Sequence, residues 1–186
     1  MASSATDKIL LPYQRRWVED DATLKIWVAA RQVGKSFALA LEAVLMALRA
    51  KCSILLLSAS ERQSREIMVK VYSHMRVLNA MTKNLAKAEA ETKTEIRIPG
   101  GSRIISLPAN PDTSRGFSGH VFLDEFAFHR DSRAIWRALF PTVTRGYKIR
   151  ISSTPQGKQN MFYDVWAHNE KFYKQKTDIY ADARSA

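Results

Sequence analysis

The sequence predicts an α/β fold in which a mainly parallel central sheet is flanked by helices. Short apolar runs typical of buried strands alternate along the chain with longer segments of helical periodicity. This alternation favours parallel strands joined by right-handed crossovers. The 186 residues, 46% of them hydrophobic, suffice for one domain with its own core. We expect a flexible N-terminal tail over residues 1–10 and one folded domain over residues 11–182.

Five strands are expected where apolar or β-branched residues form compact runs bounded by polar or turn-forming residues. They cover residues 26–29, 53–58, 121–123, 147–152 and 172–179. A β-hairpin is expected in addition over residues 94–107, because alternating residues flank Pro99-Gly100-Gly101 on both sides.

Helices are expected between these strands. The segment 37–48 is rich in Ala and Leu and forms the first helix. A second helix begins near Ser60, because the apolar residues that follow recur on one helical face. Further helices are expected around residues 135–140 and over residues 160–166, which are amphipathic.

The first strand, the turn after it and the start of the first helix have the form of a phosphate-binding loop. Gly34-Lys35-Ser36 opens the helix, so backbone N–H groups of the loop would face phosphates. Lys35 would reach the β and γ phosphates from an exposed position, and Ser36 would give its hydroxyl to Mg²⁺. In the usual pattern G-x-x-x-x-G-K-[ST] the first position is glycine, which Ala29 replaces here, and Arg31 inside the loop is unusual. The alternative is a helix that happens to begin Gly-Lys-Ser.

The strand 121–123 ends in two adjacent carboxylates, Asp124 and Glu125. Unpaired buried charge is costly, and a bound Mg²⁺ would supply a reason for it. Asp124 would hold the Mg²⁺ shell, and Glu125 would polarise an attacking water. The alternative is a surface Asp-Glu pair at a helix N-terminus. The metal-site hypothesis requires Asp124 and Lys35 to meet at one edge of the sheet.

Hydroxyl side chains end the strand 147–152 and continue beyond it as Ser152-Ser153-Thr154-Pro155. In the strand next to the acidic pair, these hydroxyls could sense the γ-phosphate and pass its loss to residues 156–160. The alternative is a turn that simply ends the strand.

The charge balance favours a polyanionic partner, above all nucleic acid. Lys and Arg number 29 against 18 Asp and Glu, a net charge of +11. The C-terminal quarter is rich in positive charge, which could contact phosphates or form an ordinary solvated face. Its basic residues include Lys148, Arg150, Lys158, Lys171, Lys174 and Lys176. The single cysteine, Cys52, excludes an intrachain disulfide and suits a reducing compartment.

In this order, the motifs resemble the ATPase domain of the large terminase subunit of tailed bacteriophages, above all that of Mu-like phages and prophages. Tyr13-Gln14 resembles the adenine-binding Q motif of that family, and residues 30–36 resemble its Walker A motif with an arginine in the loop. Residues 114–119 resemble the segment that leads into its Walker B motif. Residues 153–157, with Asn160, Phe162, Tyr163 and Trp166 after them, resemble its coupling motif.

The resemblance implies a RecA-like ATPase of the ASCE class that binds ATP and Mg²⁺. Lys35 and Glu125 would be catalytic, Arg31 would touch phosphate within its own subunit, and Arg115 could act as a finger in a neighbour's site. For Arg31 the alternative is a structural ion pair, and for Arg115 a solvated loop residue or a DNA contact. The implied metal ligands are Ser36 and Asp124. The implied nucleotide contacts are Tyr13, Gln14, Ala30, Arg31, Gln32, Val33, Gly34, Lys35, Ser36, Phe37, Ser153 and Thr154.

The resemblance also implies partners. ATP hydrolysis would drive double-stranded viral DNA into a procapsid in the host cytoplasm, with the subunits in a ring on the portal protein and a small terminase subunit beside them. The family's C-terminal nuclease domain is absent from this chain, so we expect no nuclease activity from it. Two alternatives are a helicase-like DNA-dependent ATPase of superfamily 1 or 2 and a non-enzymatic, basic nucleic-acid-binding assembly module.

Overall fold

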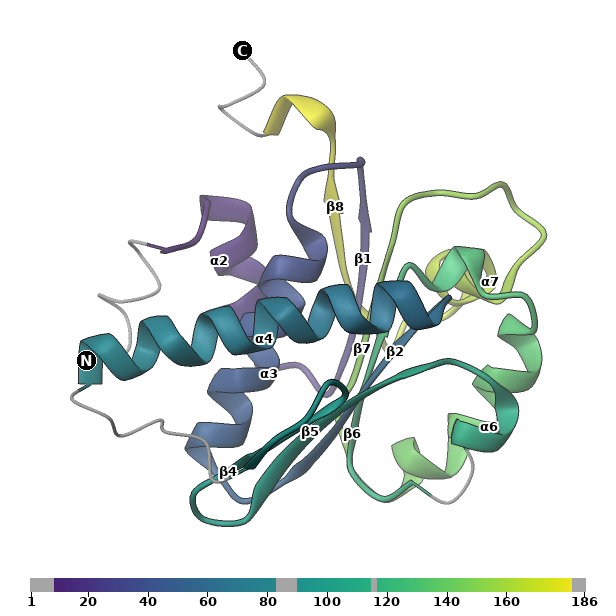
Figure 1. The fold of residues 1–186 in the computed structure, drawn as a ribbon. Helices are drawn as coiled ribbons and strands as arrows, with labels where there is room; N and C mark the ends of the chain where they lie inside the picture. The colour runs from purple at the N-terminus through teal and green to yellow at the C-terminus, as the bar shows by residue number, and fades with distance from the viewer. Residues whose placement is uncertain (1–8, 83–89, 115–116, 182–186) are drawn as a thin grey trace.

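The computed structural model describes residues 9–82, 90–114 and 117–181. One eight-stranded sheet crosses the molecule with helices on both of its faces (Figure 1). The order of the strands in the sheet is β3-β4-β5-β2-β6-β7-β1-β8. The strands are β1 (Leu24–Ala29), β2 (Ser53–Ser58), β3 (Ala90–Glu91), β4 (Glu95–Ile98), β5 (Ser102–Pro108), β6 (His120–Asp124), β7 (Ile149–Ser153) and β8 (Tyr173–Thr177).

The sheet is mainly parallel, as the sequence predicts. Every neighbouring pair from β5 to β8 is parallel, whereas β3–β4 and β4–β5 are antiparallel. Strands β4 and β5 form the predicted hairpin around Gly100 and Gly101, both of which have positive φ, at 92° and 87°. This conformation suits glycine because it has no Cβ. The predicted fold class is therefore confirmed.

Helices cover the two faces of the sheet in sequence order. The first three pack on one face and the last two on the other (Figure 1). They are α2 (Pro12–Glu19), α3 (Lys35–Arg49) and α4 (Glu61–Thr82) on the first face, and α6 (Ser132–Thr144) and α7 (Met161–His168) on the second. Shorter helical segments are α5 (Pro111–Ser114), η1 (Phe126–Phe128) and η2 (Ile179–Ala181).

The core has two parts because successive side chains of a strand point to opposite faces of the sheet. On β1, Trp27 and Ala29 belong to the cluster under α2, α3 and α4, whereas Ile26 belongs to the cluster under α6 and α7. Trp17 of α2 stacks on Trp27, with ring centroids 5.2 Å apart and planes at 26°. Burial on both faces explains why the central strands are almost continuously apolar.

The N-terminal segment differs from the prediction. Residues 12–19 form helix α2, which was not predicted, with Pro12 in its first turn, where a missing N–H is not needed. Of the expected tail, residues 1–8 lie outside the described residues, whereas Leu10 is buried in the core. The last strand is also shorter than expected, because the chain turns into η2 after Thr177.

The topology determines where a site can form. Strands β6, β7 and β1 are neighbours and parallel, so their carboxyl ends, and the loops that follow them, lie at one edge of the sheet. Open α/β sheets bind ligands at this edge. No helix within the described ranges has the length and apolarity needed to cross a bilayer.

Gly119, which precedes β6, offers a test of this packing. A Cβ atom there would lie 2.3 Å from the backbone oxygen of Ser53, so the two strands would have to move apart. We expect Gly119→Ala to lower the free energy of unfolding by about 1–3 kcal/mol in urea denaturation. Ser118→Ala is the control, because Ser118 is exposed and should change stability by less than about 0.5 kcal/mol. Equal stability of the two variants would contradict the packing described here.

Candidate active site

The loop between β1 and α3 has the backbone of a phosphate-binding turn. Gln32 and Gly34 have left-handed conformations, with φ of 63° and 78°, and Gly34 caps the N-terminus of α3. The left-handed conformation favours glycine at position 34, and a Cβ there would lie 2.3 Å from Nε2 of Gln14, so the Gln14 amide would have to move. The N-terminus of α3, which favours anions, therefore opens directly after the loop.

Lys35, the first residue of α3, lies across the carboxyl ends of three strands. Its Nζ donates to the Ala30 oxygen at 3.0 Å and to Thr154 Oγ1 at 3.1 Å. It also lies 3.3 Å from Glu125 Oε1. The expectation of an exposed side chain is wrong, since Lys35 is only 5% exposed. The physical reason is that these oxygens neutralise and solvate the ammonium in place of water.

Asp124 and Lys35 lie at the same edge of the sheet, as the metal-site hypothesis requires, and Ser36 contacts Asp124 directly. Ser36 Oγ donates to Asp124 Oδ2 at 2.6 Å, and Ser152 Oγ donates to Oδ1 at 2.9 Å. Burial raises the pKa of the Asp124 carboxyl, and the negative charge of Glu125 acts in the same direction, while the two hydroxyls and Lys35 oppose them. Ser152 lies in the predicted hydroxyl motif, but sequence reasoning did not assign it to the acidic pair.

Glu125 has an unusual backbone. Its φ of 51° and ψ of 45° are left-handed, which is uncommon for a residue with a side chain. Its Oε2 accepts from the Thr154 backbone N–H at 2.9 Å and from Ser153 Oγ at 3.3 Å. The side chain is 24% exposed, so the carboxylate is held in a fixed position and still reaches solvent. Such a residue is a candidate for a function that requires preorganisation.

A buried histidine supports the acidic pair from behind. His129 Nε2 lies 2.9 Å from the Asp124 backbone oxygen, and burial lowers the pKa of the ring. The neutral ring therefore donates from Nε2 and holds the end of β6. Ala127 N–H donates to Ser153 Oγ at 3.1 Å, which fixes the following turn. A lone histidine carries no sequence signal for this role.

Tyr13 and Gln14 hold the loop from the other side. The Tyr13 hydroxyl and Gln14 Nε2 both donate to the Val33 oxygen, at 3.0 and 2.9 Å. Gln14 Oε1 accepts from the Leu11 backbone N–H at 3.0 Å. Both side chains are buried, so their polar groups bind protein. A hollow of about 380 Å³ adjoins them. It is lined by Ile9, Leu10, Leu11, Gln14, Gln32, Gly34 and Phe37.

Of the two candidate arginines, Arg31 and Arg115, only Arg31 lies within the described residues. Arg31 is exposed, and no ion pair within the described part of the chain holds it. The alternative of a structural ion pair therefore has no support among these residues. Arg115 lies outside the described residues, so its position as a possible finger stays a prediction.

The donor set fits a magnesium ion. Ser36 Oγ and the Asp124 carboxylate supply hard oxygen ligands within 2.6 Å of each other. Within the described ranges no three His, Cys, Asp or Glu side chains gather as a metal cage. Mg²⁺ is commonly bound through one or two protein ligands, with phosphate oxygens and water completing its shell.

The mainly parallel sheet and the phosphate-binding turn before α3 define a RecA-like P-loop fold. The family described as "Terminase large subunit, T4likevirus-type, N-terminal" matches residues 26–185, and the chain belongs to this family.

Relatives and solved structures agree with this assignment. The chain is 29% identical over 164 residues to "Mu-like prophage FluMu protein gp28" of Haemophilus influenzae, covering 83% of this chain and 32% of that protein. It is 28% identical over 175 residues to "Probable terminase, large subunit gp28" of Escherichia phage Mu, covering 87% and 32%. It therefore spans about a third of the length of these relatives.

Among solved structures, a Thermus phage large terminase ATPase domain superposes with a TM-score of 0.73 at 21% identity, covering 89% of this chain and 79% of that one. The HK97 bacteriophage large terminase superposes with a TM-score of 0.66 at 17% identity, covering 90% and 39%. At identities this low, the similarity to these solved structures shows a shared fold only.

Gly34 and Gly146 form a matched pair for testing the loop. Both have φ of 78°, but a Cβ meets Gln14 only at position 34, and nothing lies within 4 Å at position 146. We expect Gly146→Ala to cost about 1 kcal/mol for its backbone alone. Gly34→Ala should cost about 1–3 kcal/mol more, because Gln14 must leave Val33. Urea denaturation measures both, and equal losses would mean that Gln14 does not hold the loop.

Proposed function

We propose that this chain is the ATPase part of a terminase large subunit and that its ATP hydrolysis powers the translocation of double-stranded viral DNA into a procapsid. The observation that carries the proposal is the meeting of Lys35, Thr154 and Glu125, which come from three different parts of the chain. Lys35 lies within 3.3 Å of both partners. A vestigial P-loop would not need a buried lysine facing a positioned carboxylate.

The roles of the residues follow from their contacts. ATP phosphates would compete with Thr154 and Glu125 for the Lys35 ammonium, which moves toward the β and γ phosphates. Glu125 is then free to accept a hydrogen bond from the attacking water and to orient it. Thr154 Oγ1 contacts both Lys35 and Glu125, at 3.1 and 3.4 Å, so it can report whether a γ-phosphate is present.

Ser36 and Asp124 would hold Mg²⁺, which neutralises charge on the phosphate oxygens when it is bound. Burial raises the pKa of Asp124, and a cation at this position would oppose that shift by favouring the ionised form. The hollow beside Gln14 and Phe37 is suited in size and polarity to a nucleobase. Arg31 is proposed to contact phosphate within its own subunit, and Arg115 to act in a neighbour's site.

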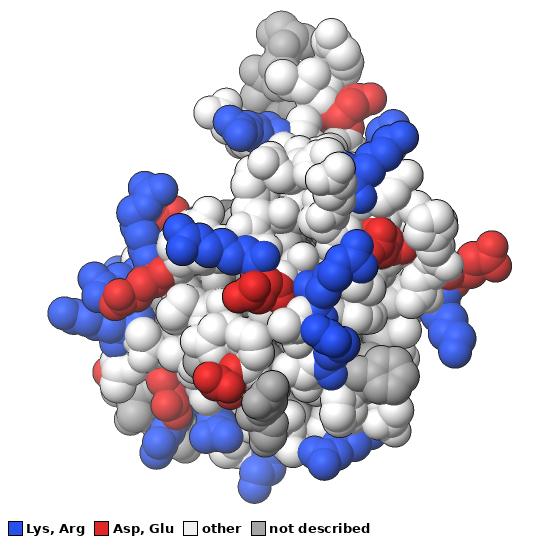
Figure 2. Space-filling view, turned by 90° about the vertical axis from the view of Figure 1, so that its right-hand side faces the viewer, with Lys and Arg blue, Asp and Glu red and all other residues white. Residues whose placement is uncertain are grey.

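The DNA contacts are proposed more broadly. Arg150 must be removed from the candidate set, because its side chain is fully buried. Lys158, Lys171, Lys174 and Lys176 are exposed and could contact phosphates. Figure 2 shows Lys and Arg side chains scattered over one face with acidic residues among them, rather than a single basic stripe. We propose that several subunits form a ring on the portal protein and that their basic faces surround the DNA. The small terminase subunit would act with this ring in the host cytoplasm.

Lys35→Ala tests the nucleotide site. We expect ATP turnover to be lost and ATP affinity to fall by about tenfold or more, because the charge aimed at the phosphates is removed. Hydrolysis is measured by phosphate release, and folding by circular dichroism. Lys51→Ala, an exposed lysine next to the amino end of β2, is the control and should behave as wild type. Wild-type turnover in Lys35→Ala would refute the assigned site.

Glu125→Gln separates binding from chemistry. The amide keeps the shape and can still receive the Thr154 N–H, but it is a poor base for water. We expect ATP to bind with wild-type affinity while hydrolysis falls by about 100-fold or more. Loss of binding together with hydrolysis would mean that Glu125 has a structural or metal-binding role instead.

DNA packaging is distinguished from helicase-like activity by what the ATPase requires. We expect turnover per molecule to rise in assembled rings on portal and procapsid. Strand separation of duplex DNA by the protein without a portal would favour the helicase-like alternative. Binding of DNA without any ATP turnover would favour the non-enzymatic assembly module.

A further inference from the structure

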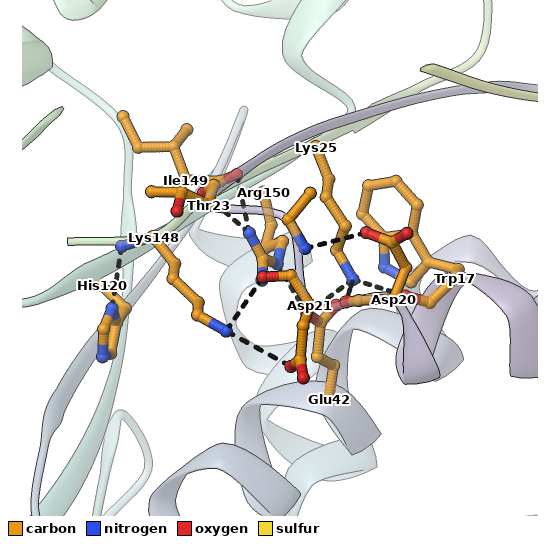
Figure 3. Close-up of polar contacts among 11 residues, drawn as sticks. Trp17, Asp20, Asp21, Thr23, Lys25, Glu42, His120, Lys148, Ile149 and Arg150 are labelled. Atoms are coloured by element: carbon orange, nitrogen blue, oxygen red, sulfur yellow. Dashed lines mark hydrogen bonds and ion pairs between the residues drawn. The ribbon is translucent and has the colours of Figure 1, made fainter. Parts of the chain in front are cut away.

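Three charged side chains meet inside the molecule at the amino ends of β1 and β7, away from the nucleotide site. Lys25 of β1 and Arg150 of β7 both approach the carboxylate of Glu42, which lies on α3 (Figure 3). Lys25 Nζ is 2.9 Å and Arg150 Nε 2.5 Å from the same atom, Glu42 Oε1. Lys25 and Arg150 are fully buried. We refer to these three residues as the ionic cluster.

Lys25 ties the cluster to the end of α2. Its Nζ donates to the backbone oxygens of Trp17 and Asp20, the latter at 2.8 Å, and lies 4.7 Å from the centre of the Trp17 ring. These carbonyls belong to the last turn of α2 and the residue after it, where a helix favours a cation. The position of α2 therefore depends on Lys25 at its carboxyl end.

The amino end of the same helix holds the phosphate-binding loop. Tyr13 and Gln14 donate to the Val33 oxygen, as described above. Helix α2 has only 8 residues, so a displacement of its last turn also displaces its first turn. The cluster can thus act on the loop through α2.

Glu42 and Arg150, the other two residues of the ionic cluster, are connected to the nucleotide site through α3 and β7. Glu42 lies about two helical turns beyond Lys35 and Ser36 on α3. Arg150 Nη1 donates to the Thr23 oxygen at 2.9 Å, and two residues further along β7 Ser152 donates to Asp124. Each element that supplies a side chain to the cluster also supplies, or leads directly into, part of the nucleotide site.

We propose that Lys25 is a positioning residue for ATP binding: by joining the end of α2 to Glu42, it holds Tyr13 and Gln14 against the phosphate-binding loop. The inference rests on the proposed function, because its readout is ATP affinity. It predicts that Lys25 affects the binding of ATP through α2, with no contact to the nucleotide.

The electrostatics of the cluster support this role. Two cations share one oxygen, while Glu42 Oε2 has no hydrogen-bond partner among the described residues. Burial lowers the pKa of Lys25 from 10.5 to about 8, Glu42 opposes the shift, and the charge of Arg150 adds to it. A neutral Lys25 amine has only two hydrogens for three acceptors, so it would hold α2 less firmly.

Lys25→Met is the first test. Methionine keeps the length of the side chain and leaves Glu42 and Arg150 as a neutral pair. We expect the Kd for ATP, measured by titration with a fluorescent ATP analogue and Mg²⁺, to rise by about fivefold or more. Ser106→Ala is the matched control, because it removes another buried donor to a helix carbonyl, from Ser106 Oγ to the Ser64 oxygen of α4 at 2.9 Å. That variant should change the Kd by less than about twofold.

The pH dependence of the wild-type protein is the second test and needs no variant to fold. On the proposal, the Kd for ATP rises by about threefold between pH 7 and pH 9, as the ammonium is lost near pH 8. The other charged groups that face Lys25 are Glu42 from α3, Arg150 from β7 and Asp20 from the connection to β1. His120, nearby on β6, has its pKa lowered by burial and by Arg150 and Lys148, so it stays neutral in this range.

Stability should change in the opposite direction. Between pH 8 and 10.5 the unfolded state binds more protons at Lys25 than the native state, so this group's contribution to the free energy of unfolding increases with pH. A loss of ATP affinity as pH rises could therefore not be explained by a loss of global stability at Lys25. The change in Kd should disappear in Lys25→Met if that variant folds.

The outcomes are distinct. Wild-type protein that does not bind ATP at any pH refutes the proposed function and this inference with it. Wild-type protein that binds ATP with a Kd unchanged from pH 7 to pH 9 overturns the inference alone. So does a folded Lys25→Met protein with wild-type affinity, or a Ser106→Ala protein that loses as much affinity as Lys25→Met.

Discussion

The hydrogen bonds of Asp124 with Ser36 and Ser152 are the constraint on which the rest of the site depends. They bring the end of β6 against the first turn of α3 and the end of β7. Lys35 begins α3 and Thr154 directly follows β7, so their contacts with Glu125 follow from this arrangement. It requires β1, β7 and β6 to be neighbours and parallel, which the crossover helices on both faces of the sheet make possible.

The sequence predicts well what depends on local pattern. The buried strands, the hairpin and the Gly34-Lys35-Ser36 turn have signals that lie within a few residues of each other, and the structure confirms them. The two motifs that contain Lys35 and Glu125 were predictable from the sequence, but the direct contact between these side chains was not. The burial of Lys35 depends on Thr154, 119 residues away, and no periodicity encodes such a contact.

Buried polar residues far from the motifs were not predictable for the same reason. Arg150 lies in a basic segment of the sequence and resembles a surface residue there. In the structure it is buried, and both Arg150 and Lys25 form ion pairs with Glu42 of α3. Helix α2 was not predicted, because Tyr13 and Gln14 were interpreted as a nucleotide-binding motif and not as part of a helix. In the structure both side chains donate to the Val33 oxygen. In each case tertiary pairing decides the role of a residue whose local sequence is ambiguous.

The left-handed backbone of Glu125 has a consequence for how this chain can change. A residue with a side chain costs about 1–3 kcal/mol in such a conformation, and glycine would adopt it without strain. Glycine at this position would relieve that strain, but it would also remove the carboxylate that neutralises the buried Lys35 ammonium. The backbone and the ion pair therefore act on the same residue in opposite directions: the left-handed conformation favours glycine, whereas the buried ammonium favours a carboxylate.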